Sequence, residues 1–135
     1  MKKQNDDQIG FTIVAGFLKG RRIVAPDLGV TRPPLTRLRK SIFDYLRPYL
    51  DEATYLDLFS GTGSYLFEAV SRGVTSATGV ELESDLADSI NRQAQKFKVG
   101  DRLNCLCADV FKQVPELSTD GRRFDIIMMA PPQYA

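Results

Sequence analysis

Residues 57–63 read DLFSGTG, and this stretch decides the fold. It begins inside a short apolar run, residues 54–59, which predicts a β-strand. A helical pattern with Leu66, Phe67 and Val70 follows and runs to Gly73. Glycines between a strand and a helix let the backbone approach a ligand. The stretch therefore predicts a strand–loop–helix unit with a ligand at the carboxyl end of the strand.

The chain after this unit alternates between strand and helix patterns. Residues 75–82, 103–107 and 124–129 are β-prone, and the last of these runs is apolar enough to predict a fully buried strand. Ser84 is expected to cap a helix that Gly100 ends, and residues 110–114 predict a short helix. This alternation predicts an α/β fold with a mostly parallel sheet that helices cover on both faces.

The chain before this unit has a different pattern. Two β-prone runs, residues 9–15 and 22–25, predict a β-hairpin, and a loop rich in proline and glycine follows at 26–34. Apolar residues then recur at helical spacing and predict an amphipathic helix, with Pro48 disturbing its last turn. The expected buried face consists of Leu35, Leu38, Ile42, Leu46 and Tyr49.

Composition excludes several classes of protein. The 135 residues are 43% hydrophobic and include no histidine, so any chemistry here proceeds without a titrating imidazole. Cys105 and Cys107 are too few to build a zinc site without histidine, and both are expected to be small core residues in a reducing compartment. The sequence has neither a membrane-spanning apolar run nor the features of a signal peptide, which predicts a cytoplasmic protein.

Charge is concentrated near the N-terminus. Between residues 19 and 47, eight Lys and Arg residues accompany two Asp residues, although the net charge of the whole chain is only +1. Such a basic segment is typical of a surface that binds phosphates, and it is equally compatible with a solvated basic surface.

Acidic residues follow the predicted strands at positions that suit a nucleoside. Glu81 ends a strand twenty residues after Gly61, where a carboxylate can accept both ribose hydroxyls, and Asp109 follows the next strand. Leu66 occupies the position of the third glycine of a dinucleotide-binding loop. Asp57 suits the sulfonium cation of S-adenosylmethionine (SAM) better than a pyrophosphate. The pattern therefore favours SAM over NAD.

Segment by segment, the chain resembles the RsmD-like family of SAM-dependent methyltransferases, which act on guanine N2 in small-subunit (16S) ribosomal RNA. The resemblance covers residues 9–134, nearly the whole chain. The segments that carry it are Ile13-Val14-Ala15-Gly16, Lys19-Gly20-Arg21-Arg22, Thr31-Arg32-Pro33, the helix residues Arg37, Arg39, Phe43 and Leu46, residues 57–63, and Glu68-Ala69-Val70-Ser71-Arg72-Gly73.

The resemblance implies a Rossmann-like class I methyltransferase fold and a role for each matching residue. Expected to bind SAM are Asp57, Phe59, Gly61, Gly63, Glu81 and Asp109. Expected to meet RNA phosphates are Lys19, Arg21, Arg22, Arg32, Arg37 and Arg39. Plainer alternatives stay open, because Phe59 can be a core residue and Asp109 can cap the next helix. The expected partner is ribosomal RNA or the small ribosomal subunit, with no metal and no membrane.

The expected acceptor site departs from the family's pattern. The family places an acidic or amide residue, two prolines and an aromatic residue after the fourth strand, whereas this chain has Ala130 followed by Pro131, Pro132, Gln133 and Tyr134. Ala130 offers no side-chain acceptor for the guanine amine. Either Gln133 or backbone carbonyls take over that role, or the site is weakened or inactive.

Domain organisation follows from these patterns. Residues 1–34 are expected to form a basic RNA-contacting arm, and residues 35–135 a SAM-binding core that stops after the fourth of the fold's seven strands. The part that would cover residues 125–129 is expected to be missing, which leaves an aggregation-prone edge. Alternatives are a non-catalytic SAM- or RNA-binding fragment, or a methyltransferase that acts on DNA or protein.

Overall fold

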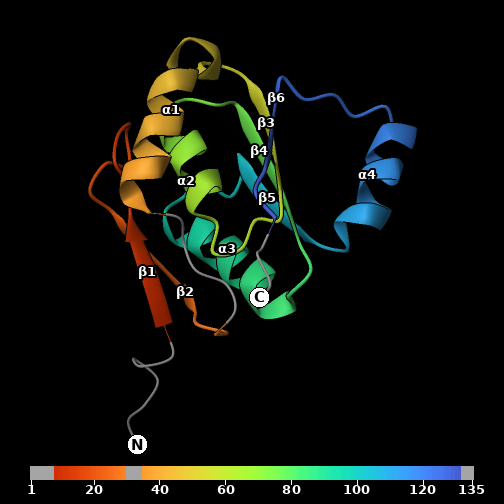
Figure 1. Cartoon of the computed structure of the whole chain (residues 1–135), viewed down its shortest axis with the longest axis horizontal. Helices are drawn as coiled ribbons and strands as arrows, with labels where there is room; N and C mark the ends of the chain where they lie inside the picture. Colours follow the sequence, from red (N-terminus) through yellow and green to blue (C-terminus); the bar gives the residue numbers. More distant parts are fainter. Residues whose placement is uncertain (1–7, 30–34, 132–135) are drawn as a thin grey trace, which may run out of the picture.

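The computed structural model describes residues 8–29 and 35–131 and contains a hairpin and a four-stranded parallel sheet (Figure 1). In the hairpin, β1 (Gln8–Thr12) pairs antiparallel with β2 (Arg22–Pro26). The predicted hairpin is confirmed, although its first strand ends at Thr12. The chain between the strands still closes through hydrogen bonds, because the Ile13 N–H donates to the Arg21 carbonyl and the Gly20 N–H to the Ile13 carbonyl.

The sheet confirms the predicted α/β architecture. All its strands run parallel in the order β5-β4-β3-β6. Their bounds are β3 (Thr54–Leu58), β4 (Ser76–Glu81), β5 (Leu103–Cys107) and β6 (Ile126–Met129). In the described sheet β6 is an edge strand and exposes Ile127 and Met129, so the full burial that its apolar sequence predicts is not present here. A bare edge at this strand, as expected, is thus present within the part of the chain that the structure describes.

Helices cover both faces of the sheet. Residues of α1 (Thr36–Leu50), α2 (Ser64–Ser71) and α3 (Ser84–Lys96) share one hydrophobic cluster with the hairpin and with Tyr55 of β3. Among the described helices, only α4 (Val110–Thr119) packs on the opposite face, against Leu56 and Leu58, and it stands apart in Figure 1. The hairpin lies beside α3, where the Val24 N–H donates to the Gln93 side chain over 3.2 Å.

The buried face of α1 differs from the predicted one. Leu35, Leu38 and Tyr49 are exposed, whereas Phe43, Leu50 and the charged Arg39 are buried. The helix therefore turns toward the core a face that hydrophobicity alone does not identify. Pro48 does not end the helix, which runs two residues further; burial of Leu50 in the core stabilises this last turn.

Three helix boundaries differ from the sequence-based prediction. Glu83, not Ser84, is the N-cap of α3, and no side chain caps that helix. The same helix ends at Lys96, before Gly100, because Lys98 adopts the left-handed conformation (φ 64°) that usually falls to glycine. Helix α4 continues past Val114, since Leu117 is buried beneath it against the sheet.

The two cysteines lie in different environments. Cys105 is buried, and this burial raises the pKa of its thiol to about 12, so the thiol is uncharged near neutral pH. Cys107 is exposed, which contradicts the prediction that both are core residues. Its position at the last residue of β5, where the strand leaves the sheet, explains the difference.

Among the described helices, none is long and apolar enough to cross a membrane.

Candidate cofactor site

The glycine loop, residues 59–63, connects β3 to α2 at the carboxyl end of the sheet. Gly61 (φ 59°) and Gly63 (φ 90°) both adopt left-handed conformations. A Cβ atom on Gly63 would lie 2.9 Å from Cγ1 of Ile90, so this position also lacks room for a side chain. The loop closes on itself through the Gly63 N–H, which donates to the Ser60 carbonyl over 2.9 Å. Glycine is thus required here by conformation and by space.

Phe59 adopts a left-handed conformation as well, with φ 63°. A bulky residue rarely occupies this region, and such backbone strain is concentrated at functional sites. Its half-buried ring meets the ring of Phe111 edge-on, with 6.3 Å between the centroids. Phe59 therefore lies at the boundary of the core, beside the loop, and is not plain core.

Glu81 joins two loops at the end of β4. One of its carboxylate oxygens accepts the Gly61 N–H over 2.7 Å, and the other accepts the Glu83 N–H over 2.9 Å. The side chain is buried, yet each carboxylate oxygen retains acceptor capacity for a further donor. Gly61 and Glu81, both expected to bind the cofactor, are therefore joined by a direct hydrogen bond.

Asp57 is a buried carboxylate, 2% exposed, at the penultimate position of β3. Burial, and then the charge of Glu81, raise the pKa of Asp57 well above its usual value. No hydrogen bond to its carboxylate occurs among residues 8–29 and 35–131. A buried carboxylate of this kind favours a cation nearby, because a positive charge relieves both the desolvation cost and the repulsion from Glu81.

Asp109 lies on the same side of the sheet as these groups. The Ala108 N–H donates to the Glu81 carbonyl over 3.0 Å, which holds the end of β5 against the end of β4. The Asp109 side chain accepts the Phe111 N–H over 2.8 Å and is the N-cap of α4. The plainer alternative for Asp109, a helix cap, is therefore present in the structure.

Two exposed apolar side chains beside these carboxylates were not identified from the sequence. Leu82 directly follows Glu81 and is 64% exposed; Phe111 follows Asp109 by two residues and is 80% exposed. Their sequence signal is an apolar residue one or two positions after an acid that ends or closely follows a strand. An adenine ring needs apolar walls of this kind beside its polar contacts.

The predicted RNA-binding residues divide into two groups. Lys19, Arg21, Arg22 and Arg37 are exposed. Arg39 is completely buried, and its Nε lies 3.1 Å from Oε1 of Glu68, so the prediction that Arg39 meets RNA phosphates is wrong. Its position on the core-facing side of α1, rather than with the other basic residues at the surface, is the physical reason. Arg32 lies outside the described residues.

The predicted acceptor segment is described only at its beginning. Pro131 is exposed and follows β6, whose Met129 pairs with Leu58 at the end of β3. This register brings Pro131 to the same edge of the sheet as the glycine loop. Pro132, Gln133 and Tyr134 lie outside the described residues.

Other kinds of site are less well supported. Within the described ranges, no group of three or more His, Cys, Asp or Glu residues is arranged to hold a metal ion. A shallow apolar pocket lies between α4 and β6, with Leu117, Phe124 and Ile127 in its walls. None of the residues that line it belongs to the glycine loop or carries one of the acidic groups above.

Comparisons with known proteins found relatives that match most of the chain. The model of the family described as "Conserved hypothetical protein 95" matches residues 11–135. Ribosomal RNA small subunit methyltransferase D of Haemophilus influenzae is 31% identical over 124 residues, which cover 89% of this chain and 62% of that protein. The protein of the same name from Escherichia coli K12 is 33% identical over 101 residues, 74% of this chain and 51% of that protein.

A solved structure shows the same fold. The structure of a hypothetical protein of Thermus thermophilus is 32% identical, with a TM-score of 0.80, and the match covers 90% of this chain and 69% of that one. The chain spans 62% and 51% of the length of the two curated relatives.

Proposed function

Because the chain belongs to the family described as Conserved hypothetical protein 95, the RsmD family, we propose that it takes part in SAM-dependent methylation of ribosomal RNA. The finer proposal is transfer of a methyl group to the exocyclic N2 of a guanine in 16S rRNA. One observation supports the cofactor above all others: the Gly61 N–H and the Glu81 carboxylate meet directly at the carboxyl end of the parallel sheet.

SAM, when bound, supplies a methyl group activated on a sulfonium cation. We assign its binding to residues of the glycine loop and the neighbouring strand ends. Glu81 accepts hydrogen bonds from the ribose hydroxyls, and Asp109 accepts a hydrogen bond from the adenine amine. Gly61 and Gly63 allow the backbone to approach the cofactor closely. Phe59 lines the same site. Leu82 and Phe111 add the apolar walls that were not identified from the sequence.

The cationic cofactor fits the charge of this site. Asp57 is buried without a hydrogen-bond partner among the described residues, and the charge of Glu81 raises its pKa further. The ammonium and sulfonium groups of SAM provide the positive charge that such a carboxylate favours. A pyrophosphate, as in NAD, would add negative charge beside two carboxylates.

Replacing Asp57 by asparagine is expected to stabilise the fold and to weaken cofactor binding. Because burial raises the pKa of Asp57 above its unfolded value, the free energy of unfolding falls as pH rises from about 4 to the raised pKa. The Asp57→Asn variant lacks this fall and is therefore expected to be more stable than the unsubstituted chain at neutral pH. Urea denaturation between acidic and neutral pH measures the difference.

The same variant is expected to bind S-adenosylhomocysteine (SAH) about tenfold more weakly and to lose more affinity for SAM, because only SAM carries the sulfonium charge. Calorimetry with both ligands measures this. Equal losses of affinity for SAH and SAM would count against a role for Asp57 beside the sulfonium. Unchanged affinity for both ligands would show that Asp57 does not belong to the cofactor site.

The basic arm, residues 1–34, supports RNA as the substrate. We propose that this arm contacts RNA and that residues 35–135 form the SAM-binding core. Lys19, Arg21 and Arg22 are exposed on the arm, and Arg37 is exposed at the start of α1. Positive side chains that are free of buried partners can meet phosphates. Labelled-methyl transfer to 16S rRNA, DNA and ribosomal protein, followed by nucleoside analysis for N2-methylguanosine, tests both the acceptor and the modified atom.

The acceptor segment is where the chain departs from its family, since Ala130 offers no acceptor for the guanine amine. We assign the substrate-facing role to Pro131, Pro132, Gln133 and Tyr134. Prolines lack an N–H and have a restricted φ, so they present carbonyls to the base, and the aromatic ring of Tyr134 stacks on it.

Replacing Gln133 by alanine is expected to lower the rate of methyl transfer to 16S rRNA about 10- to 100-fold, because the amide oxygen orients the amine for attack. SAH affinity stays unchanged. The matched variant Ala130→Asn supplies an amide three positions earlier and is expected to raise the rate. An unchanged rate in Gln133→Ala would show that backbone carbonyls suffice. SAH binding with no methyl transfer by the unsubstituted chain would favour the alternative of a non-catalytic SAM- and RNA-binding protein.

A further inference from the structure

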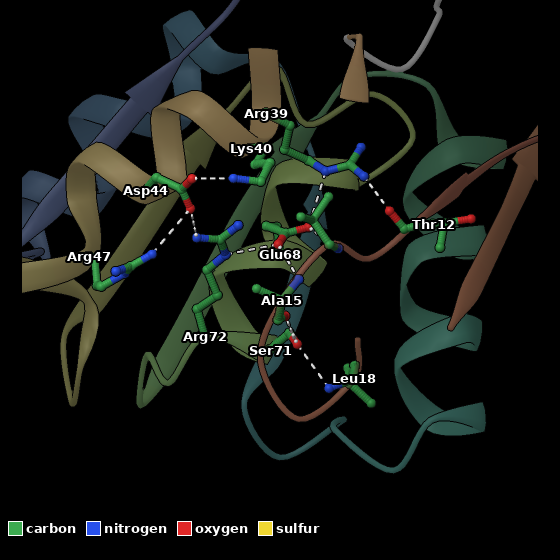
Figure 2. Close-up of polar contacts among 11 residues, drawn as sticks. Thr12, Ala15, Leu18, Arg39, Lys40, Asp44, Arg47, Glu68, Ser71 and Arg72 are labelled. Atoms are coloured by element: carbon green, nitrogen blue, oxygen red, sulfur yellow. Dashed lines mark hydrogen bonds and ion pairs between the residues drawn. The ribbon is translucent and has the colours of Figure 1, made fainter. Parts of the chain in front are cut away.

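Two side chains of helix α2 hold the arm turn, residues 14–18, through hydrogen bonds (Figure 2). The two carboxylate oxygens of Glu68 accept the N–H groups of Val14 and Ala15 over 3.1 and 3.2 Å. The Ser71 hydroxyl accepts the Leu18 N–H over 2.9 Å and donates to the Ala15 carbonyl over 2.6 Å. The arm is thus attached through these backbone hydrogen bonds and through buried apolar side chains such as Ile13 and Leu18, rather than through its basic side chains.

The arm turn also packs closely against the C-terminal end of α2. The Phe17 N–H donates to the Ser71 carbonyl over 2.9 Å. Gly16 lies against the same carbonyl in a left-handed conformation (φ 90°), and a Cβ atom there would lie only 1.9 Å from the Ser71 oxygen. Only glycine allows this approach.

Glu68 is 0% exposed, and its negative charge is balanced by two guanidinium groups. Its Oε1 lies 3.1 Å from Nε of Arg39, and its Oε2 lies 2.9 Å from Nε of Arg72. Arg72 in turn contacts Asp44 over 2.9 Å. A buried carboxylate with these partners has a fixed orientation, which is what a hydrogen-bond acceptor for a loop backbone requires.

The same helix begins at the glycine loop. Gly63 is the N-cap of α2, and all eight residues of the helix are buried. At 1.5 Å per residue the helix is about 12 Å long, and it packs as one rigid element. The glycine loop and the arm turn are therefore attached to opposite ends of one buried helix.

We propose that Glu68, together with Ser71, is a positioning residue that sets the place of the RNA-binding arm relative to the cofactor loop. This inference rests on the proposed function. Loss of the Glu68 carboxylate loosens the arm turn, so that Lys19, Arg21 and Arg22 are no longer held in one place for RNA phosphates, while the glycine loop keeps its own hydrogen bond to Glu81.

The test compares Glu68→Gln and Ser71→Ala with the control Asp44→Asn in the full chain. Ser71→Ala removes two arm contacts without touching the ion pairs, so it serves if Glu68→Gln fails to fold. Asp44→Asn weakens the outer ion pairs, and among the described residues Asp44 makes no hydrogen bond or ion pair to the arm turn. Three quantities are measured: amide hydrogen exchange at Val14, Ala15 and Leu18, affinity for a 16S rRNA transcript at several salt concentrations, and calorimetric affinity for SAH.

In Glu68→Gln and Ser71→Ala, exchange at the arm turn is expected to become about tenfold faster. The slope of log affinity for the transcript against log salt falls by about 1–2, since fewer phosphates are contacted. SAH affinity stays within about twofold, and Asp44→Asn matches the unsubstituted chain in exchange and slope. A general loss of stability would instead change SAH affinity and exchange throughout the molecule.

Two outcomes separate the inference from the proposed function. If the unsubstituted chain binds the transcript with salt dependence and the folded variants keep the same slope or the same exchange, the positioning role is overturned alone. If the unsubstituted chain binds no RNA, the proposed RNA substrate and this inference fail together.

Discussion

Replacing Arg39 by alanine is expected to lower the free energy of unfolding by about 3–5 kcal/mol, because it leaves the buried Glu68 carboxylate without one of its two cationic partners. Arg39 and Glu68 are both 0% exposed. The guanidinium also donates to the Thr12 carbonyl of β1 (Figure 2). It lies 5.4 Å from the centre of the Phe11 ring. Urea or thermal denaturation measures the loss.

The expected loss is large relative to the total stability of a small domain, about 5–15 kcal/mol. Arg37→Ala is the matched control, since Arg37 lies on the same helix and is exposed. Its effect on stability is expected to stay within about 0.5 kcal/mol. If Arg39→Ala were as stable as Arg37→Ala but bound RNA more weakly, the role of Arg39 would be at the RNA surface, as its neighbours in the sequence suggest, and the buried ion pair would be of no consequence.

Replacing Glu81 by alanine is expected to lower SAH affinity about 100-fold or more. The substitution removes the acceptor of the Gly61 and Glu83 N–H groups and, in the proposed function, the acceptor of the ribose hydroxyls. Hydrogen bonds to a charged group contribute about 1.5–3 kcal/mol each, and a tenfold change in affinity corresponds to about 1.4 kcal/mol. Calorimetric titration of SAH measures the affinity.

Two further variants separate the causes. Glu81→Gln keeps one acceptor oxygen and is expected to bind SAH more weakly than the unsubstituted chain but better than Glu81→Ala. Asp88→Asn removes an exposed carboxylate from α3, among the residues after the same loop, and is expected to leave SAH affinity unchanged. Saturable SAH binding of full affinity in Glu81→Ala would show that the cofactor site lies elsewhere.

The fold class followed from local patterns in the sequence. Alternating strand and helix signals, with a glycine-containing loop after residues 54–59, predicted the parallel sheet because buried parallel strands are continuously apolar and the helices between them are periodic. The same patterns placed Gly61 and Glu81 at one edge of the sheet. Parallel strands bring their carboxyl ends together whatever the details of packing, but the direct hydrogen bond between the Gly61 N–H and Glu81 was seen only in the structure.

Boundaries and burial followed less well, since they depend on partners far away in the chain. Helix α4 extends to Thr119 because Leu117 packs on the sheet, and α3 ends early because Lys98 adopts the conformation expected of a glycine. Leu38 and Tyr49 belong to the apolar face of α1 by periodicity but are exposed, since periodicity identifies an apolar face without identifying what covers it.

The sequence by itself determined the α/β architecture, the glycine loop and the acidic residues at the strand ends, because each depends on residues close together in the chain or on the common direction of parallel strands. Only the tertiary structure decided the role of Arg39. In the sequence it is one basic residue among eight between positions 19 and 47. In the fold it lies against Glu68, 29 positions later, because α1 and α2 bury their facing sides together. A charge at the surface and a charge in the core have the same sequence signal, and only the packing of distant elements distinguishes them.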